Sequence, residues 1–270
     1  MHLFIDGKNA IYRAVYASQK SKGLSFTYLI RQIASWMIKY NPDSVHVFWD
    51  APRAEVWRRK IHPTYKDREG NEYIENIKPE IEKTINQAQI LFNNMGIRQY
   101  SKKSMEADDL IYAAVNVLYP QNIAIVSTDG DMAQIIYRYN NVTLFNSSTN
   151  CEVKKPEHDP VYMKILTGDK SDTIEGFRGI GDKKATALLE SKYGFYDFSK
   201  DNKEKFKFNM VLVDLSVCPH LMINKLYCMD ILSKIVNYDN QKIIDSCKEL
   251  KLTSYLMEHN NYAPHFRKLK

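Results

Sequence analysis

The sequence lacks the features of a disulfide-stabilised, zinc-binding or membrane protein. Its 270 residues include four cysteines, which form no C-x-x-C pair and have no histidine at the spacing of a zinc site. It has no apolar run of about 18 residues and no basic, signal-like amino terminus. We therefore expect a soluble, cytoplasmic protein with no membrane contact, whose cysteines are reduced and mostly buried.

Other absences narrow the class of function. The seven histidines share no spacing and no G-x-S-x-G elbow is present, so nothing indicates a nucleophilic triad. Hydrophobic residues make up 44% of the chain, which excludes a disordered protein. The net charge of +6 weakly favours a polyanionic partner, because 32 acidic residues offset 38 basic ones and the clustering of charge matters more than its sum.

Three short apolar segments, predicted as strands, each end on an aspartate. They place Asp6, Asp50 and Asp129 at strand ends, with Asp131 just beyond the third. Amphipathic stretches with a period near 3.6 residues lie between them, at 26–40 and 78–95. This alternation predicts a mostly parallel, three-layer α/β sheet, whose ligands bind beyond the carboxyl ends of the strands. A single acid there is often only a turn former or a helix cap, but three strands with the same ending favour a shared site.

Residues 105–118 are predicted to form a buried helix that begins with three acids. Glu106, Asp108 and Asp109 lie in its first turn, and Ser104 is a candidate N-cap. The helix dipole favours one acid at this position, so a purely structural explanation stays open. Three carboxylates about 4 Å apart repel one another by roughly 4 kcal/mol at an effective dielectric near 20, however, and a divalent cation removes that cost.

A basic stretch at 53–68 follows the second predicted strand. It holds six lysines or arginines against two acids, with Trp57 and Tyr65 among them. Such runs are usually solvated surface loops, but this one lies next to the predicted acidic site and favours a phosphate clamp with aromatic rings for base stacking. Its candidate nucleic-acid contacts are Arg53, Arg58, Arg59, Lys66 and Arg68.

A second region of interest follows the last predicted strand, 142–145. A predicted helix at 162–167 ends at Gly168, and the acids Asp169 and Asp172 come directly after it. The chain then reads G-F-R-G-I-G-D-K-K-A from residue 176, a glycine turn that enters a helix with lysines in its first turn.

This turn has the pattern of a helix-hairpin-helix. Gly179 and Gly181 allow backbone N–H groups to approach a phosphate, and an anion would relieve the unfavourable position of Lys183 and Lys184 at a helix N-terminus. We predict a nuclease-like core at 1–155 with a basic arch near 53–77, and a helical region at 156–270. Residues 194–270 are interpreted as a helical cap on the hairpin with a solvated tail.

Together these motifs resemble the 5′-nuclease superfamily of flap endonucleases and 5′→3′ exonucleases, and in size the free-standing bacteriophage members. The resemblance spans about residues 1–190 and follows the family's order of motifs. The motifs are F-I-D-G at Phe4, F-W-D at Phe48, Y-K at Tyr65, M-E-A-D-D at Met105, S-T-D-G-D-M-A-Q at Ser127, T-G-D-K-S-D at Thr167 and G-I-G-D-K-K at Gly179.

The resemblance implies a PIN-like core with a helical region, and phosphodiester hydrolysis with two Mg²⁺ ions, for which Mn²⁺ can substitute. One ion would be held by Asp6, Asp50, Glu106 and Asp108. The second would lie near Asp129, Asp131, Asp169 and Asp172, with Asp109 close to both through water. Oxygen-only ligands agree with these metals.

The resemblance also implies roles for basic residues and glycines. Lys66 matches an arch lysine that contacts the scissile phosphate. Lys183 matches a hairpin lysine near the DNA backbone, and Lys164 stands where relatives have a basic residue. The Gly179–Gly181 turn matches a site for phosphate and often K⁺. The family's arch reads Y-K-x-x-R, whereas Arg68 stands one residue nearer here, and Thr173 replaces a common asparagine.

The implied partners and the alternative functions follow from the same resemblance. The implied partners are branched or 5′-flapped DNA or an RNA/DNA hybrid, with replication proteins, and the chain is expected to be a monomer. A PIN-like ribonuclease would lack the Asp169/Asp172 pair and the hairpin. A non-catalytic DNA-junction-binding protein would have lost acids, and all nine are present.

Overall fold

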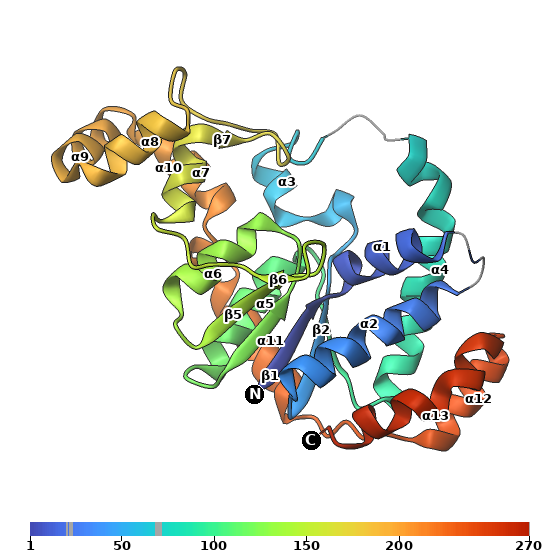
Figure 1. Ribbon diagram of the computed structural model, residues 1–270. Coiled ribbons are helices and arrows are strands. Elements are labelled where there is room, and N and C mark those ends of the chain that lie inside the picture. Colours follow the sequence, from blue (N-terminus) through green and yellow to red (C-terminus); the bar gives the residue numbers. More distant parts are fainter. Residues whose placement is uncertain (20, 22–23, 68–71, 270) are drawn as a thin grey trace.

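A six-stranded sheet in the order β3-β2-β1-β4-β5-β6 forms the centre of this computed structural model (Figure 1). The structure describes residues 1–19, 21, 24–67 and 72–269. Neighbouring strands run parallel except β6, which is antiparallel to β5. The strands are β1 (His2–Asp6), β2 (Ser44–Trp49), β3 (Arg98–Ser101), β4 (Ile123–Val126), β5 (Val142–Asn146) and β6 (Cys151–Glu152). The predicted parallel α/β sheet is confirmed.

Helices cover both faces of this sheet, which gives three layers (Figure 1). One face packs against α1 (Gly7–Ser18), α2 (Ser25–Tyr40) and α4 (Glu72–Asn94). The other packs against α5 (Ala107–Leu118), α6 (Ala133–Arg138) and α11 (Leu221–Ser233). Side chains alternate along each strand, so Leu3 and Ile5 face the first layer while Phe4 faces the second. Strands buried on both faces explain the continuous apolar runs in the sequence.

A third hydrophobic cluster joins the basic stretch to the helical region. Val56 and Tyr65 pack there with Ile165 and Phe206. Two short helices, η1 (Arg53–Glu55) and α3 (Trp57–Ile61), form the base of the predicted arch. The helical region contains α7 (Pro160–Thr167), the two-stranded β7 (Gly168–Asp169) and β8 (Ile174–Glu175), α8 (Asp182–Glu190), α9 (Lys192–Asp201) and α10 (Lys203–Val213).

The interpretation of residues 194–270 as a cap on the hairpin with a solvated tail fits α9 and α10, which pack beside α8 and α7, but is wrong for the last three helices, which pack on the core. After η3 (Leu215–Val217), α11 lies along α5, while α12 (Asn240–Glu249) and α13 (Thr253–Arg267) lie against α4 and α2 (Figure 1). Cys228 is buried in the α5 layer, and Tyr255 and Phe266 are buried in the opposite layer. The boundary near residue 155 stays a prediction.

Several local features differ from the sequence-based expectations. Ser104 does not cap α5; Glu106 is its N-cap, in a capping box with Asp109. Residue 7 begins helix α1 directly, and strand β3 was not predicted. Cys151 is exposed whereas the other three cysteines are buried, and all four are free. Among the described helices, none has the length and apolar character needed to cross a bilayer.

Candidate metal centre

The carboxyl ends of three adjacent strands carry the first acids of the site. Because β2, β1 and β4 are neighbours in the sheet, Asp50, Asp6 and Asp129 reach the same edge. Asp6 is the last residue of β1, Asp50 directly follows β2, and Asp129 lies three residues beyond β4. We call these three residues the central acids. Their convergence agrees with the prediction from strand endings.

Each central acid also has a local structural role. Asp6 caps α1, since its Oδ1 accepts the N–H of Asn9 at 3.0 Å. Asp129 caps the short helix η2 (Gly130–Met132) in the same manner. Asp50 accepts the N–H of Ala107 at 2.8 Å, which fixes the start of α5 against the end of β2. The structural and functional explanations of these acids are therefore compatible, because capping occupies only part of each carboxylate.

Glu106, Asp108 and Asp109 form the inner acidic cluster. All three are buried, and each offers a carboxylate oxygen within 4.8 Å of the others. The α5 capping box brings Glu106 and Asp109 together, because Asp109 Oδ2 accepts the backbone N–H of Glu106 at 3.2 Å. Burial together with three like charges needs a compensating cation.

Arg58 is that cation inside the protein. Its side chain is 1% exposed, and its Nη1 donates to Glu106 Oε2 at 2.7 Å while its Nη2 donates to Asp109 Oδ1 at 2.9 Å. Its Nε donates to the carbonyl of Leu212 at 3.0 Å, which ties α3 to α10. The expectation that Arg58 contacts DNA does not fit this placement, because its guanidinium is enclosed by carboxylates and has no path to a phosphate.

Asp109 is equally enclosed. Besides Arg58, the indole N–H of Trp57 donates to its Oδ2 at 2.9 Å, so both carboxylate oxygens are taken up by protein donors. Asp109 thus has little capacity left for a ligand, and its donors are buried, whereas one donor to Glu106 is the partly exposed Lys66. Its contacts support a role in positioning the α5 turn.

Asp131, Asp169 and Asp172 form the outer acidic cluster, whose carboxylate oxygens also lie within 4.8 Å of one another. Lys164 on α7 lies among them, with its Nζ donating to Asp169 Oδ2 at 2.6 Å and to Asp131. Unlike Arg58, the Lys164 side chain is 28% exposed. Lys164 therefore lies in the acidic site rather than on an open DNA-binding surface.

A close approach of two glycines sets the position of Asp169. Gly168 has φ +82°, and a Cβ on it would lie 2.3 Å from the backbone nitrogen of Gly176 on the returning strand. A side chain at this position would separate β7 from β8. The end of α7 at Gly168 was predicted correctly, and this tight turn explains why Asp169 and Asp172 face the sheet edge.

The Y-K motif links the two clusters. The Tyr65 hydroxyl lies 3.2 Å from Glu106 Oε2 and 3.0 Å from Asp172 Oδ2. Lys66 Nζ donates to Glu106 Oε1 at 2.6 Å and lies 4.0 Å from Asp172 Oδ1. Lys66 has φ +55°, a conformation that is uncommon for a side-chain-bearing residue, and its N–H donates to the Asp172 carbonyl at 3.2 Å. The arch base therefore brings an ammonium group to the junction of both clusters.

Burial raises the pKa of several of these acids, and hydrogen bonds from a lysine lower the pKa of one of them. Burial, together with Asp50 and Asp129, raises the pKa of Asp6 to about 7. Burial and the Asp131 charge likewise raise the pKa of Asp129. Burial alone would raise the pKa of Asp169, but the Lys164 and Ser171 hydrogen bonds lower it to about 2. Asp6 therefore differs from Asp169, because no lysine hydrogen bond compensates its burial.

Burial also acts on Glu106 and on the two lysines, but their ion pairs outweigh it. Burial would raise the pKa of Glu106, whereas Arg58 and Lys66 bring it below its ordinary value. Burial would lower the lysine values, but the carboxylates raise the pKa of Lys66 and of Lys164. Both lysines are therefore fully charged at neutral pH.

The donor set of the two clusters and the central acids fits hard divalent cations. Every side chain offered is a carboxylate, the type of oxygen ligand that Mg²⁺ and Mn²⁺ prefer. The ammonium group of Lys66 pairs with Glu106, and that of Lys164 pairs with Asp131 and Asp169. Each cluster therefore attracts a cation. The residues present therefore fit a metal at each cluster.

The hairpin lies beyond the outer acidic cluster and is exposed. Gly179 has φ +76°, and Gly181 is the N-cap of α8 and provides no side-chain oxygen to its first turn. Lys183 and Lys184 are exposed in that turn. This geometry leaves backbone N–H groups and two ammonium groups facing solvent at a helix N-terminus, which fits an anion.

The other residues of the basic stretch lie outside the acidic clusters. Arg53 and Arg59 are both 3.5 Å from Asp67 on the surface of the arch base. Arg68 lies outside the described residues. Thr173, whose role the sequence left uncertain, donates its hydroxyl proton to the Thr64 carbonyl, so it holds the arch base against the β7–β8 loop.

Sequence reasoning missed the residues between the arch base and the hairpin. A cavity of about 760 Å³ lies there, open to solvent. His62, Arg178 and Lys205 are among its lining residues, together with Asp169, which the sequence did predict. Lys205 donates to the Gly176 carbonyl at 2.7 Å and lies over the Phe177 ring. These residues are separated by up to 143 positions in sequence (62 to 205), so no local pattern joins them.

Comparison with known proteins identifies the family. A family model described as "5′-3′ exonuclease, N-terminal resolvase-like domain" matches residues 1–170. The 5′-3′ exonuclease of Aquifex aeolicus is 30% identical over 284 residues, which cover 94% of this chain and 93% of that protein. The chain therefore belongs to the 5′-3′ exonuclease family. It is a hydrolase of the 5′-3′ exonuclease and flap endonuclease type that acts on DNA and has acidic metal-binding clusters.

Solved structures of a bacteriophage T5 protein share the fold. A complex of a variant of the T5 D15 flap endonuclease with DNA and metal ions has a TM-score of 0.67 at 19% identity, covering 93% of this chain and 98% of that chain. The T5 5′-exonuclease with divalent metal ions (zinc) has a TM-score of 0.66 at 19% identity, covering 93% and 99%. Divalent metal ions are thus bound in structures with this fold.

Proposed function

We propose that the chain is a structure-specific 5′-nuclease that cleaves DNA near 5′ flaps and 5′ ends with two divalent metal ions, preferentially Mg²⁺. The observation that carries this proposal is the junction at Tyr65 and Lys66, which joins two acidic clusters at one sheet edge. A purely structural ion-pair network would not need nine acids from five separate segments at the ligand-binding edge.

The two clusters divide the metal ligands. The first metal would be held by Glu106 and Asp108 of the inner acidic cluster with Asp6 and Asp50. The second would be held by the outer acidic cluster with Asp129, while Asp109 keeps the α5 turn in place. When bound, two such ions supply an activated water and charge stabilisation for both the attacking and the leaving oxygen. Mn²⁺ would be accepted for the same oxygen ligands.

Lys66 is the residue of this chain that meets the scissile phosphate. Its ammonium lies between the two clusters at 31% side-chain exposure, so it can pair with carboxylates or turn to a phosphate that arrives from solvent. A phosphate whose negative charge grows during hydrolysis gains more from this charge than the ground state does. The Tyr65 hydroxyl lies within hydrogen-bond distance of Glu106 and Asp172 and can donate its single proton to either, which keeps the lysine backbone nearby.

The hairpin binds the duplex away from the scissile bond. The amides around Gly179 and Gly181 and the ammonium groups of Lys183 and Lys184 face one anion-binding surface, suited to successive phosphates and to a K⁺ ion between them. The cavity lined by Arg178 and Lys205 joins this surface to Asp169, and we assign it to the strand between the hairpin and the scissile phosphate. Arg53 and Arg59 would contact the backbone at the arch base.

The substrate class follows from the two separate surfaces. A duplex on the hairpin and a single strand at the arch base describe DNA with a free 5′ end or flap, and an RNA/DNA hybrid offers the same backbone charges. This substrate suits primer or flap removal during replication and repair, with replication proteins as partners and the enzyme acting as a cytoplasmic monomer.

The test is cleavage of one 5′-labelled flap substrate with and without metal. We expect cleavage near the junction in Mg²⁺ or Mn²⁺, no cleavage in EDTA, and little cleavage of blunt duplex lacking a free 5′ strand. A single-stranded RNA control addresses the ribonuclease alternative. Tight junction binding without cleavage in any divalent metal would instead support a non-catalytic junction-binding protein.

A further inference from the structure

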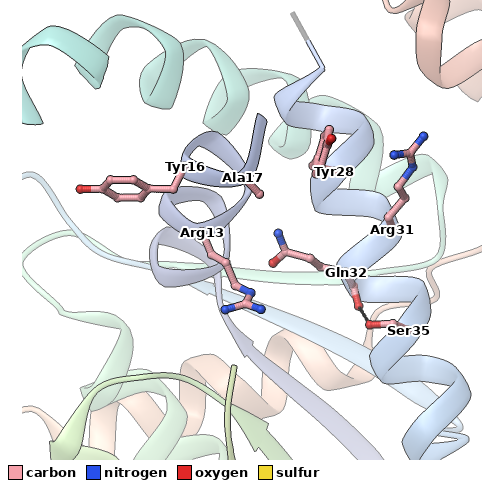
Figure 2. Close-up of a pocket in the computed structure, with 7 residues that line it drawn as sticks. All are labelled: Arg13, Tyr16, Ala17, Tyr28, Arg31, Gln32 and Ser35. Atoms are coloured by element: carbon pink, nitrogen blue, oxygen red, sulfur yellow. Dashed lines mark hydrogen bonds between the residues drawn. The ribbon is translucent and has the colours of Figure 1, made fainter. Parts of the chain in front are cut away.

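A groove lies between α1 and α2, two of the helices that cover one face of the sheet. Seven residues line it, and its cavity volume is about 560 Å³ (Figure 2). The lining residues share one face of each helix, because Arg13 and Tyr16 are three positions apart on α1, and Tyr28 and Gln32 are four apart on α2. Figure 2 shows Arg13 and Gln32 projecting into the space between the helices, whereas Tyr16 and Arg31 project to its outer sides.

The groove lies in a segment without acids. Residues 7–42 contain no aspartate or glutamate but six basic residues. Acids from other elements neutralise some of this charge: Glu258 pairs with Arg31, and Glu152 lies 3.8 Å from Lys39. Arg13 makes no ion pair or hydrogen bond with any part of the chain that the structure describes. A charged side chain left unpaired in an otherwise neutralised groove points to an anionic ligand.

Gln32 and an aromatic pair add features that a phosphate ion alone would not need. The Gln32 Oε1 is buried and accepts no hydrogen bond from the described residues, so its hydrogen-bonding capacity is unused. Tyr16 on α1 stacks on Tyr73 at the start of α4, with ring centroids 5.3 Å apart and an interplanar angle of 20°. Both rings are solvent-facing, at 44% and 40% exposure.

The position of the groove connects it to the site of cleavage. Helix α1 starts at the cap residue Asp6, so Arg13 lies about two turns, roughly 10 Å, along the helix from the metal edge. Tyr73 lies on α4, the helix that follows the arch segment. Helix α1 thus runs from the end of β1 to a contact with α4 (Figure 1).

We infer that the α1–α2 groove is a subsite for single-stranded DNA, which holds nucleotides of the 5′ strand after they pass the metal centre. Arg13 binds a phosphate, the Tyr16–Tyr73 pair offers a ring on which a base stacks, and the Gln32 amide bonds to a polar base edge. Because every base has a ring face and a polar edge, these contacts allow binding without a strict sequence requirement. This inference rests on the proposed function. It adds the expectation that the affinity for a substrate depends on the length of its 5′ flap.

The experiment compares two substrates that share one duplex, with 5′ flaps of about 2 and about 20 nucleotides. Binding is measured in EDTA, so that no strand is cut. For Arg13→Gln and for Tyr16→Leu we expect the Kd for the long flap to rise roughly tenfold, with no change for the short flap. For Arg13→Gln the salt slope of long-flap binding should also fall by about 0.7, the value for one single-strand phosphate contact.

Lys39→Ala is the matched control, because it removes one positive charge from the same acid-free segment at the far end of α2. It should leave both Kd values unchanged. Equal losses on both substrates would assign Arg13 to the duplex and overturn the inference, as would variants with no effect on the long flap. Cleavage assays of the unaltered protein report separately on the proposed function, since wild-type failure to cut either flap in Mg²⁺ would remove that proposal first.

Discussion

The inner and outer acidic clusters have the same charge but are built differently. The inner acidic cluster surrounds a fully buried arginine, whose fixed planar fork pairs with Glu106 and Asp109. The outer acidic cluster surrounds Lys164, a flexible ammonium that remains 28% exposed. The first arrangement is a permanent part of the fold, whereas the second can exchange its cation for another. Loss of the protein's own cation should therefore cost more stability at the inner acidic cluster than at the outer one.

The largest expected effect is a loss of turnover when an acid of the outer acidic cluster is replaced. Asp131→Asn weakens a metal ligand without opening the core, so cleavage of a flap substrate in Mg²⁺ should fall by about 10³-fold or more. Stability of the metal-free protein should stay the same or increase, because one repulsive charge is removed. Single-turnover cleavage and urea unfolding of the same preparation test both parts. A folded variant with normal turnover would remove Asp131 from the metal centre.

The corresponding change at the inner acidic cluster should act on stability. Arg58→Met leaves Glu106 and Asp109 buried without their partner, so the free energy of unfolding should fall by about 3–5 kcal/mol. Lys164→Met, its counterpart in the outer acidic cluster, should cost less, since the Lys164 side chain is 28% exposed whereas that of Arg58 is 1% exposed. Urea unfolding in EDTA gives both values, and similar losses for the two variants would contradict the distinction between the clusters.

Combining Arg58→Met with Asp109→Leu supplies the control for that comparison. The double variant removes both partners of the buried pair, so it should recover part of the lost stability. Recovery would show that the loss comes from an unpaired charge rather than from the shape of the arginine side chain.

Lys66 joins the clusters, so its removal should affect the chemical step and leave duplex binding unchanged. Lys66→Ala should lower single-turnover cleavage by roughly 10²-fold, the scale for loss of one preorganised electrostatic donor. The Kd for the duplex part should change little, because the hairpin binds it separately. A variant that loses affinity but cleaves bound substrate at the normal rate would make Lys66 a general phosphate clamp.

The central acids predict how pH affects the metal-free protein. The pKa of Asp6 is about 7 in the folded protein, above its ordinary value of 3.8, so the folded state binds the proton more tightly. Stability should therefore fall as pH rises from about 4 to about 7, by on the order of 2–4 kcal/mol from this group. Asp6→Asn should lack most of this slope in urea unfolding with EDTA. An unchanged slope would show that Asp6 is not the responsible group.

The sequence predicted the acidic edge because its signals are local. Each of Asp6, Asp50 and Asp129 follows an apolar strand, and parallel strands bring their carboxyl ends to one edge. Glu106 and Asp108 lie in one helical turn, and Asp169 and Asp172 follow a helix end at glycine. Strand and helix periodicity were therefore sufficient to identify the positions of these acids.

What the sequence could not provide depends on contacts between distant segments. Arg58 lies in a run of basic residues typical of a surface, and only the packing of α3 against α5 and α10 encloses it. Strand β3 is four residues long and largely polar, so it has no clear strand pattern. The burial of α11, α12 and α13 against the core likewise follows from tertiary contacts, because each of these helices could have covered another surface.

A metal centre built from two clusters is tested most directly by counting the metal ions that bind to the unaltered protein and to one variant of each cluster. Mn²⁺ binding, followed by calorimetry without DNA, should show two ions for the unaltered protein. Asp108→Asn should weaken one of these and Asp131→Asn the other, each leaving one ion bound with near-normal affinity. A single ion in the unaltered protein, or loss of the same ion in both variants, would contradict a centre built from two clusters.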